Sequence, residues 1–130
     1  MVDQFYAWYI QSFKQEYTHG IWRGILNYDL AEIAINLDSG INPNLVSTLH
    51  YEKFTGYSLL HFVTDPNVIR LSGIRRAFIV QMLLISGANP NVTIARPDKK
   101  FDDVTPLCLA QKSDFFDVTQ VLLLAGSNKI

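Results

Sequence analysis

The sequence predicts an all-α domain in which a unit of two helices is repeated along the chain. Three observations favour this fold: a closing segment with a glycine recurs, an apolar helical run stands ahead of two of its copies, and a matched helix start lies further upstream. The length of 130 residues fits one domain. A composition of 48% hydrophobic and 18% charged residues is typical of a globular protein with a buried core.

The closing segment is a glycine followed by asparagine-rich turn residues. Residues 38–44 read DSGINPN, residues 85–91 read ISGANPN, and residues 124–128 read LAGSN, a weaker match. Glycine ends helices well because it has no Cβ atom and tolerates a left-handed backbone, and Asn and Pro then turn the chain. The pattern predicts three helices that end at glycine, namely Gly40, Gly87 and Gly126.

The two helices of each unit are predicted from the segments ahead of these glycines. Apolar helical runs cover residues 78–84 and 118–124, and the upstream segment 56–63 (GYSLLHFV) parallels 103–110 (DVTPLCLA). The Ser or Thr of the upstream segment can cap a helix, and Pro106 stands in the first turn, where its missing N–H costs nothing.

These segments resemble the ankyrin repeat, a unit of about 33 residues that opens with T-P-L-H-x-A and folds as a turn plus two helices. The ISGANPN segment resembles the family's closing G-A-D-x-N, and the resemblance covers about residues 20–130. From Thr105 to Gly126 the spacing of 21 residues is the family's own. From Ser58 to Gly87 it is 29, which places extra residues between the two helices of that repeat. The hairpins between repeats are also lengthened.

The resemblance implies a single ankyrin-repeat α-solenoid over residues 1–130. Its expected parts are an N-terminal capping helix over 1–18, a degenerate first repeat over 19–53, a second repeat with insertions over 54–100, and a third repeat over 101–130. The first repeat matches poorly, because residues 20–26 (GIWRGIL) fit the first-helix motif badly.

The capping helix is predicted from an aromatic stripe. Phe5, Trp8, Tyr9 and Phe13 fall on one helical face after Asp3, which can cap the helix. A solenoid must cover the outer face of its first repeat. The alternative is that this helix binds a partner.

Most motif residues have structural roles in this interpretation. The resemblance implies that His61 hydrogen-bonds to neighbouring backbone and joins adjacent units, whereas Cys108 puts a small buried thiol at the matching position. In the insertion, Val68, Ile69 and Leu71 are expected to fold back onto the domain. The expected core leucines are Leu60, Leu83, Leu84, Leu107, Leu122 and Leu123.

Catalytic, metal and cofactor sites find no support in the motifs. His19, His50 and His61 have no regular ligand spacing, and Cys108 is the one cysteine. No phosphate-binding glycine loop or nucleophile motif occurs. The acidic pair at residues 102–103 is best interpreted as a solvated loop. We therefore expect no enzyme activity, no metal and no cofactor.

The net charge and the hydropathy of the sequence argue against nucleic acid and membranes as partners. Eleven Lys and Arg against twelve Asp and Glu give a net charge of −1, with basic doublets at residues 75–76 and 99–100 alone, so nucleic acid is not expected as a partner. No apolar run approaches the ~18 residues of a membrane span. Without a secretory signal at its start, the chain is expected to be cytoplasmic.

The resemblance implies a non-enzymatic module that binds another protein, whose identity the sequence does not give. Small ankyrin proteins with long hairpins resemble those that intracellular bacteria or large viruses direct at host proteins, which would place the chain in a host cell. Two alternatives stay open: an inhibitory or immunity-type subunit that blocks an enzyme, and the targeting part of a longer enzyme.

The expected binding surface is the concave face, centred just ahead of each first helix. Phe54 and Phe101 take the same place in successive repeats, and Tyr51, Arg96 and Lys99 lie in the hairpin tips. The alternative is that the two phenylalanines hold the hairpins on their own repeats. The predicted protein-binding residues are Phe54, Thr55, Tyr57, Asp65, Phe101, Asp102, Val104, Lys112 and Ser113.

The C-terminal end has an apolar stripe that would meet a fourth repeat. Phe116 and Leu123 belong to it, together with the more polar Thr119 and Gln120. Either the chain associates end to end through Phe116 and Leu123, or these two side chains are tolerated exposures.

Overall fold

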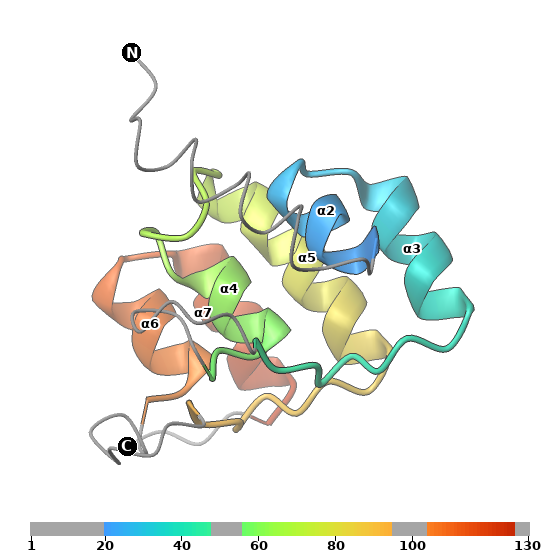
Figure 1. Ribbon diagram of the computed structural model, residues 1–130. Coiled ribbons are helices and arrows are strands. Elements are labelled where there is room, and N and C mark those ends of the chain that lie inside the picture. Colours follow the sequence, from blue (N-terminus) through green and yellow to red (C-terminus); the bar gives the residue numbers. More distant parts are fainter. Residues whose placement is uncertain (1–19, 48–55, 95–103, 127–130) are drawn as a thin grey trace. The chain divides into compact units, whose positions relative to one another are not determined.

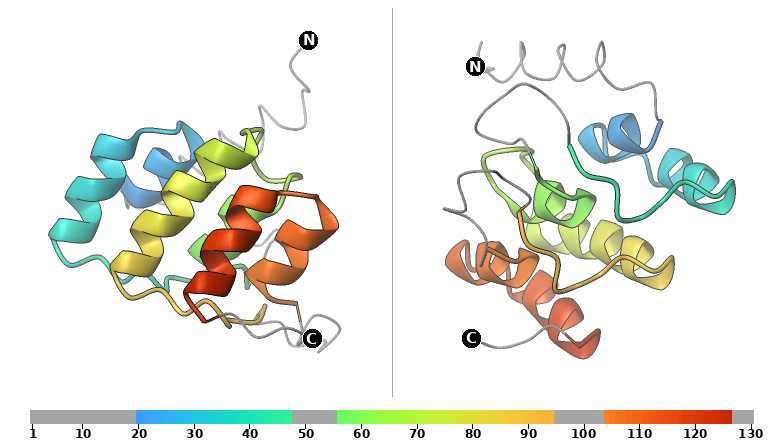
Figure 2. Two further views of the ribbon diagram at one scale, coloured as in Figure 1. Left: turned by 180° about the vertical axis from the view of Figure 1, so that it is seen from behind. Right: turned by 60° about the horizontal axis from the view of Figure 1, so that its bottom comes forward.

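The computed structural model describes residues 20–47, 56–94 and 104–126. The chain forms two compact units, residues 1–41 and 42–130. The described residues are mostly helical (Figures 1 and 2), and the β-structure among them is limited to an isolated bridge between Val46 and Ser58. The predicted capping helix over 1–18 and the tips of both long hairpins lie outside the described residues.

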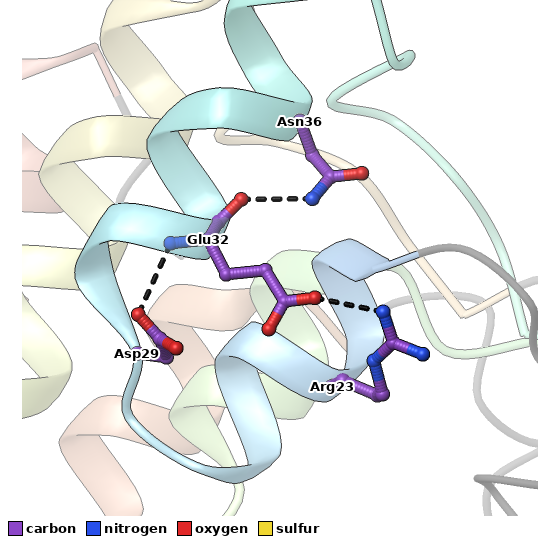
Figure 3. Close-up of polar contacts among 4 residues, drawn as sticks. All are labelled: Arg23, Asp29, Glu32 and Asn36. Carbon is purple, nitrogen blue, oxygen red and sulfur yellow. Dashed lines mark hydrogen bonds and ion pairs between the residues drawn. The ribbon is translucent and has the colours of Figure 1, made fainter.

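The first unit contains two packed helices, α2 (Gly20–Leu26) and α3 (Leu30–Asp38). Its buried side chains include Trp22, Ile25 and Ile33. Figure 3 shows the polar contacts beside them: the Asp29 carboxylate caps α3 by accepting from the Glu32 N–H at 3.1 Å. Arg23 of α2 pairs with Glu32 of α3 at 2.9 Å. Residues 20–26 thus form the first helix of this pair, although they match the motif poorly.

Gly24 allows α2 and α3 to approach closely. A Cβ atom at this position would lie 2.8 Å from Ile33 Cγ1, 3.2 Å from the Ile33 nitrogen and 3.3 Å from the Asp29 oxygen. Two of these atoms belong to backbone and the third to a fully buried side chain, so none can move away easily. Gly24 is fixed by packing, in agreement with its burial.

We expect Gly24→Ala to lower the free energy of unfolding by about 1–3 kcal/mol, the usual effect of overpacking. Gly20→Ala is the control, because its nearest neighbours are the side-chain ends of Asn36 and Glu32, both at 2.7 Å, which can rotate away by giving up surface contacts such as the ion pair with Arg23. Urea denaturation of both variants measures the difference. Equal stability of the two variants would contradict the close approach at Gly24.

The second unit arranges four helices in two layers. The first layer contains α4 (Leu59–Thr64) and α6 (Pro106–Lys112), and the second contains α5 (Gly73–Ile85) and α7 (Phe116–Leu124). Helix α4 packs on α5 and α6, and α7 packs on α5 and α6. In Figure 2 the two helices of each layer lie side by side. This is the repeated pair of helices that the sequence predicts.

The helix boundaries follow the predicted local signals. The Ser58 and Thr105 hydroxyls accept from the N–H groups of His61 and Cys108 and cap α4 and α6. Gly40, Gly87 and Gly126 follow α3, α5 and α7 with φ of 98°, 104° and 97°, the left-handed conformation in which glycine is favoured. The three predicted helix ends are confirmed.

The first and third repeats share the same turn between their helices. Tyr28 and Asp114 occupy corresponding positions and both have positive φ, 51° and 58°. The next N–H in each turn donates to an equivalent carbonyl: Asp29 N to Gly24 O at 2.8 Å, and Phe115 N to Ala110 O at 3.0 Å. Residues 20–40 are thus built like a regular repeat. In the second repeat, residues 65–72 replace this short turn.

The predicted core is largely confirmed. Four leucines are buried, whereas Leu84 and Leu123 are half-buried. Val68 and Ile69 of the insertion are also buried and Leu71 is half-buried, so this loop does fold back onto the domain. The buried leucines are Leu60, Leu83, Leu107 and Leu122.

Candidate protein-binding surface

The segment ahead of α4 is the base of a hairpin. Ser47 donates its N–H to the Tyr57 carbonyl at 2.7 Å, and Gly56 donates to the Ser47 carbonyl at 3.0 Å. The Leu59 N–H continues the pairing to the Leu45 carbonyl at 3.2 Å. The start of α4 is therefore held by the preceding strand-like segment, residues 45–47.

His61 joins α4 to the segment ahead of α6. Its Nε2 atom lies 2.9 Å from the Val104 carbonyl oxygen, and its Nδ1 atom accepts from the Ser58 N–H at 3.2 Å. Because Nδ1 is an acceptor, the ring proton is on Nε2 and is donated to Val104. The predicted role of His61 is confirmed: one neutral imidazole caps its own helix and holds the next repeat.

Burial lowers the pKa of His61 from its ordinary value of 6.5 to about 4. The hydrogen bond to the Val104 carbonyl and the charge of Asp65 oppose this shift without cancelling it. Between about pH 4 and 6.5, His61 is therefore neutral in the folded protein, whereas the same side chain is protonated in the unfolded chain.

The stability contributed by neutral His61 is expected to fall as the pH decreases from 6.5 towards 4, because the unfolded state binds the extra proton in that window. At about pH 5 the loss relative to pH 7.5 is about 2 kcal/mol. Urea titrations of wild type and His61→Gln at both pH values measure it, since glutamine does not titrate. An equal pH dependence in the two proteins would contradict a buried neutral His61.

Tyr57 and Asp65 do not lie on an exposed surface, and this part of the expected binding site is wrong. Their exposed fractions are 7% and 4%. The Tyr57 hydroxyl donates to Asp65 Oδ2 at 2.6 Å, and Asp65 Oδ1 accepts from the Asn67 N–H at 2.8 Å. The Tyr57 ring also contacts His61. Both side chains connect α4 to the insertion and are not exposed for contact with a partner.

The other predicted site residues fall into two groups. Val104 is half-buried, with its carbonyl engaged by His61; Lys112 is exposed in the last turn of α6, and Ser113 caps the C-terminus of that helix. Phe54, Thr55, Phe101 and Asp102 lie outside the described residues, as do Tyr51, Arg96 and Lys99.

Arg76 is a buried structural residue, although its place in an arginine doublet suggests an exposed side chain. Its side chain is 1% exposed, and its guanidinium donates to the carbonyls of Val63 at 2.7 Å, Leu71 at 3.0 Å and Asp65 at 3.4 Å. A further short hydrogen bond reaches the Ile69 carbonyl. The guanidinium carbon also lies 4.5 Å from the centre of the Phe115 ring. Arg76 thus fastens the inserted loop to α5 and α7.

The closing turns are connected by a repeated asparagine contact. Asn44 donates its side-chain amide to the Gly87 carbonyl at 3.3 Å and accepts from the Asn89 N–H at 2.7 Å. At the next position, Asn91 donates to the Gly126 carbonyl at 3.3 Å. The two Asn side chains link one closing turn to the next, on the same register as the repeats.

Within the parts of the chain that the structure describes, no three His, Cys, Asp or Glu side chains gather as a metal site. No helix among those residues is long and apolar enough to cross a membrane.

Comparison with solved structures identifies the architecture. An ankyrin repeat domain from Acinetobacter baumannii AYE superposes with a TM-score of 0.58 and 26% sequence identity, over 81% of this chain and 46% of that one. The chain has an ankyrin-repeat-like fold. It spans less than half of the length of that bacterial ankyrin domain.

Two further comparisons gave no match. No protein-family model matches the sequence, and a search of curated proteins found no significant similarity. The ankyrin assignment therefore rests on the repeat pattern and on the structural likeness.

The ankyrin motif is altered in the third repeat. Cys108 stands where His61 stands in the second, and the Thr105 hydroxyl lies 3.3 Å from its Sγ atom. The thiol is half-buried, which corrects the expectation of a buried thiol. The physical reason is that the described residues contain no further helix pair beyond α6 and α7 to cover it.

Proposed function

We propose that the chain is a non-enzymatic protein-binding module that contacts its partner with the connections ahead of α4 and α6. Ankyrin-type solenoids generally serve as interaction scaffolds, and the structural likeness supports that class. The observation that carries the proposal is the hydrogen bond from His61 to the Val104 carbonyl. It holds the start of α6 beside α4, so that two successive connections depart from a common, rigid base.

Phe54 and Phe101 are the proposed anchors. Each stands four residues ahead of a helix cap, Ser58 or Thr105, and chain connectivity keeps it within about 14 Å of that cap. Aromatic side chains contribute much of the binding energy at many interfaces. Two phenylalanines in the same register are therefore suited to enter neighbouring apolar pockets of a partner.

Polar residues complete the proposed surface. Thr55 and Asp102 follow the two anchors directly, and Lys112 and Ser113 supply a rim at the far end of α6. Tyr57 and Asp65 are left out because they are buried. That the target is a host-cell protein stays a prediction. The similar ankyrin domain comes from a bacterium, which agrees with a bacterial and not a viral origin of such a host-directed protein.

The experiment is affinity capture from a host lysate with mass spectrometry, followed by titration of the captured protein against variants. Phe54→Ala and Phe101→Ala should each weaken binding by about 2 kcal/mol or more while the melting temperature stays nearly constant. Gln81→Ala, an exposed position on α5, is the control and should bind normally.

The opposite result identifies the structural alternative. If melting falls in the phenylalanine variants and the remaining folded protein binds normally, the two rings hold the hairpins on their own repeats. The proposed binding site is then wrong.

A further inference from the structure

Tyr57 is held at both of its polar ends. Its carbonyl accepts from the Ser47 N–H at 2.7 Å in the pairing ahead of α4, and its hydroxyl donates at 2.6 Å to Asp65, the residue that ends this helix. Between these two ends, the centre of the Tyr57 ring lies 5.5 Å from that of His61 and 6.0 Å from that of Phe62. The side chain therefore spans α4, from the segment ahead of the helix to its C-terminal end.

Asp65 is an immobilised acceptor for this hydroxyl. Its backbone N–H donates to the His61 carbonyl at 3.0 Å, and its own carbonyl accepts from the Arg76 guanidinium at 3.4 Å. Of the carboxylate oxygens, Oδ1 accepts from the Asn67 N–H at 2.8 Å and Oδ2 accepts from Tyr57. Each polar atom of Asp65 thus has a hydrogen-bond partner. A buried carboxylate held in this way cannot follow the tyrosine if the hairpin base moves.

The third repeat lacks this pair. Counted from the helix caps, Val104 stands in the place of Tyr57 and Lys112 in the place of Asp65. Valine has no hydroxyl to donate and lysine has no acceptor. The segment ahead of α6 is held by a different contact, the hydrogen bond between the His61 ring and the Val104 carbonyl. The Tyr57–Asp65 bond is therefore not required by the repeat as such, and it occurs in the repeat that carries the insertion.

The bond adds direction to a contact that apolar packing alone would leave undirected. Hydrophobic burial is non-directional, whereas a short bond from a hydroxyl to a carboxylate fixes both distance and angle. Burying a carboxylate also costs free energy unless it is fully hydrogen-bonded. A leucine at position 65 would avoid that cost, so the pair is better explained by the geometry that it fixes.

We propose that the Tyr57–Asp65 hydrogen bond positions the first hairpin for binding, with the insertion as its support. The bond fixes the hairpin base at Gly56 and Tyr57. Phe54 stands three residues ahead of Tyr57 and so within about 11 Å of it. The inference rests on the proposed function, in which Phe54 contacts the partner. A contact residue on a fixed base loses less conformational freedom when it binds.

Amide hydrogen exchange of Tyr57→Phe, followed by NMR, tests the inference without a partner. The substitution keeps the ring and removes the hydroxyl, so the hairpin base loses its bond to Asp65. We expect the amides of Ser47 and Gly56, which pair with each other's strand, to exchange about tenfold faster or more.

Val118→Ala is the control for a general loss of stability. It removes two buried methyl groups from α7, in the other layer of helices. We expect the Ser47 and Gly56 amides to exchange nearly as slowly in this variant as in the wild type. Equal acceleration in Val118→Ala and Tyr57→Phe would overturn the positioning role, and so would unchanged exchange in Tyr57→Phe.

The second readout is binding of the protein captured in the experiment above. Tyr57→Phe should weaken it by about fivefold or more, although the tyrosine ring is buried, whereas folded Val118→Ala should bind normally. Asp65→Asn perturbs the same bond from the other side. The double variant should therefore weaken binding by clearly less than the product of the two separate factors.

Binding by Phe54→Ala separates this inference from the proposed function. Normal binding by that variant would contradict both. Weakened binding by Phe54→Ala, together with normal binding by folded Tyr57→Phe, would overturn the positioning role alone and leave the proposed function in place.

Discussion

Replacing Arg76 by methionine is expected to lower the free energy of unfolding by about 3 kcal/mol or more. Methionine keeps much of the buried aliphatic chain but removes every donor. The carbonyls of Val63, Asp65, Ile69 and Leu71 then lose a hydrogen bond inside the protein. A buried acceptor without a donor costs about 1–3 kcal/mol, so the loss over several carbonyls is large even after the charge itself is gone.

Arg76→Lys separates geometry from charge. Lysine retains the positive charge, but its single ammonium group cannot reach carbonyls spread around a planar guanidinium. We expect a loss of about 2 kcal/mol or more for this variant. Arg75→Met is the matched control: it removes an exposed arginine from the adjacent position and should cost clearly less than Arg76→Met, because contacts at the surface contribute little to stability.

The stability of all three arginine variants is measured by the midpoint of urea unfolding, provided that the dependence of the unfolding free energy on urea concentration is unchanged. Equal midpoints for Arg76→Met and Arg75→Met would show that Arg76 does not hold the inserted loop.

Leu107→Ala is expected to cost about 2–5 kcal/mol, the range for a buried leucine. Leu107 is buried in α6, which packs on α4 and on α7. Because each repeat is stabilised by its neighbours, the loss should appear as one cooperative shift of the urea midpoint. Leu124→Ala is the control, since that side chain is almost fully exposed, and both are measured at low micromolar concentration. An unchanged midpoint for Leu107→Ala would contradict its place in the core.

The repeat pattern predicted those elements that local chemistry determines. Ser58, Thr105 and the three closing glycines act through short-range backbone hydrogen bonds and dihedral angles, so their residue types alone indicate helix ends. The role of His61 came from the resemblance to ankyrin repeats, and the structure confirms it. The core leucines were predicted from their alignment with the repeat motif.

The inserted loop could not be predicted in the same way. An arginine doublet is normally exposed, and only the fold reveals that Arg76 faces a ring of loop carbonyls while Arg75 stays at the surface. Tyr57 and Asp65 are also buried, and they bond to each other, with Asp65 held by the Asn67 N–H of the insertion. The first repeat was obscured because Gly24 replaces a motif residue to allow the close contact with Ile33.

The central claim is that His61 joins two consecutive ankyrin-type repeats as a neutral imidazole. A long-range ¹H–¹⁵N NMR correlation of the histidine rings at about pH 6 tests it most directly, with His61→Gln assigning the signals. We predict a neutral ring with the proton on Nε2 that is protected from exchange, because the pKa of His61 is lowered to about 4 and Val104 accepts that proton. A ring at His61 that is mostly protonated at this pH, or one with its proton on Nδ1, would contradict the account.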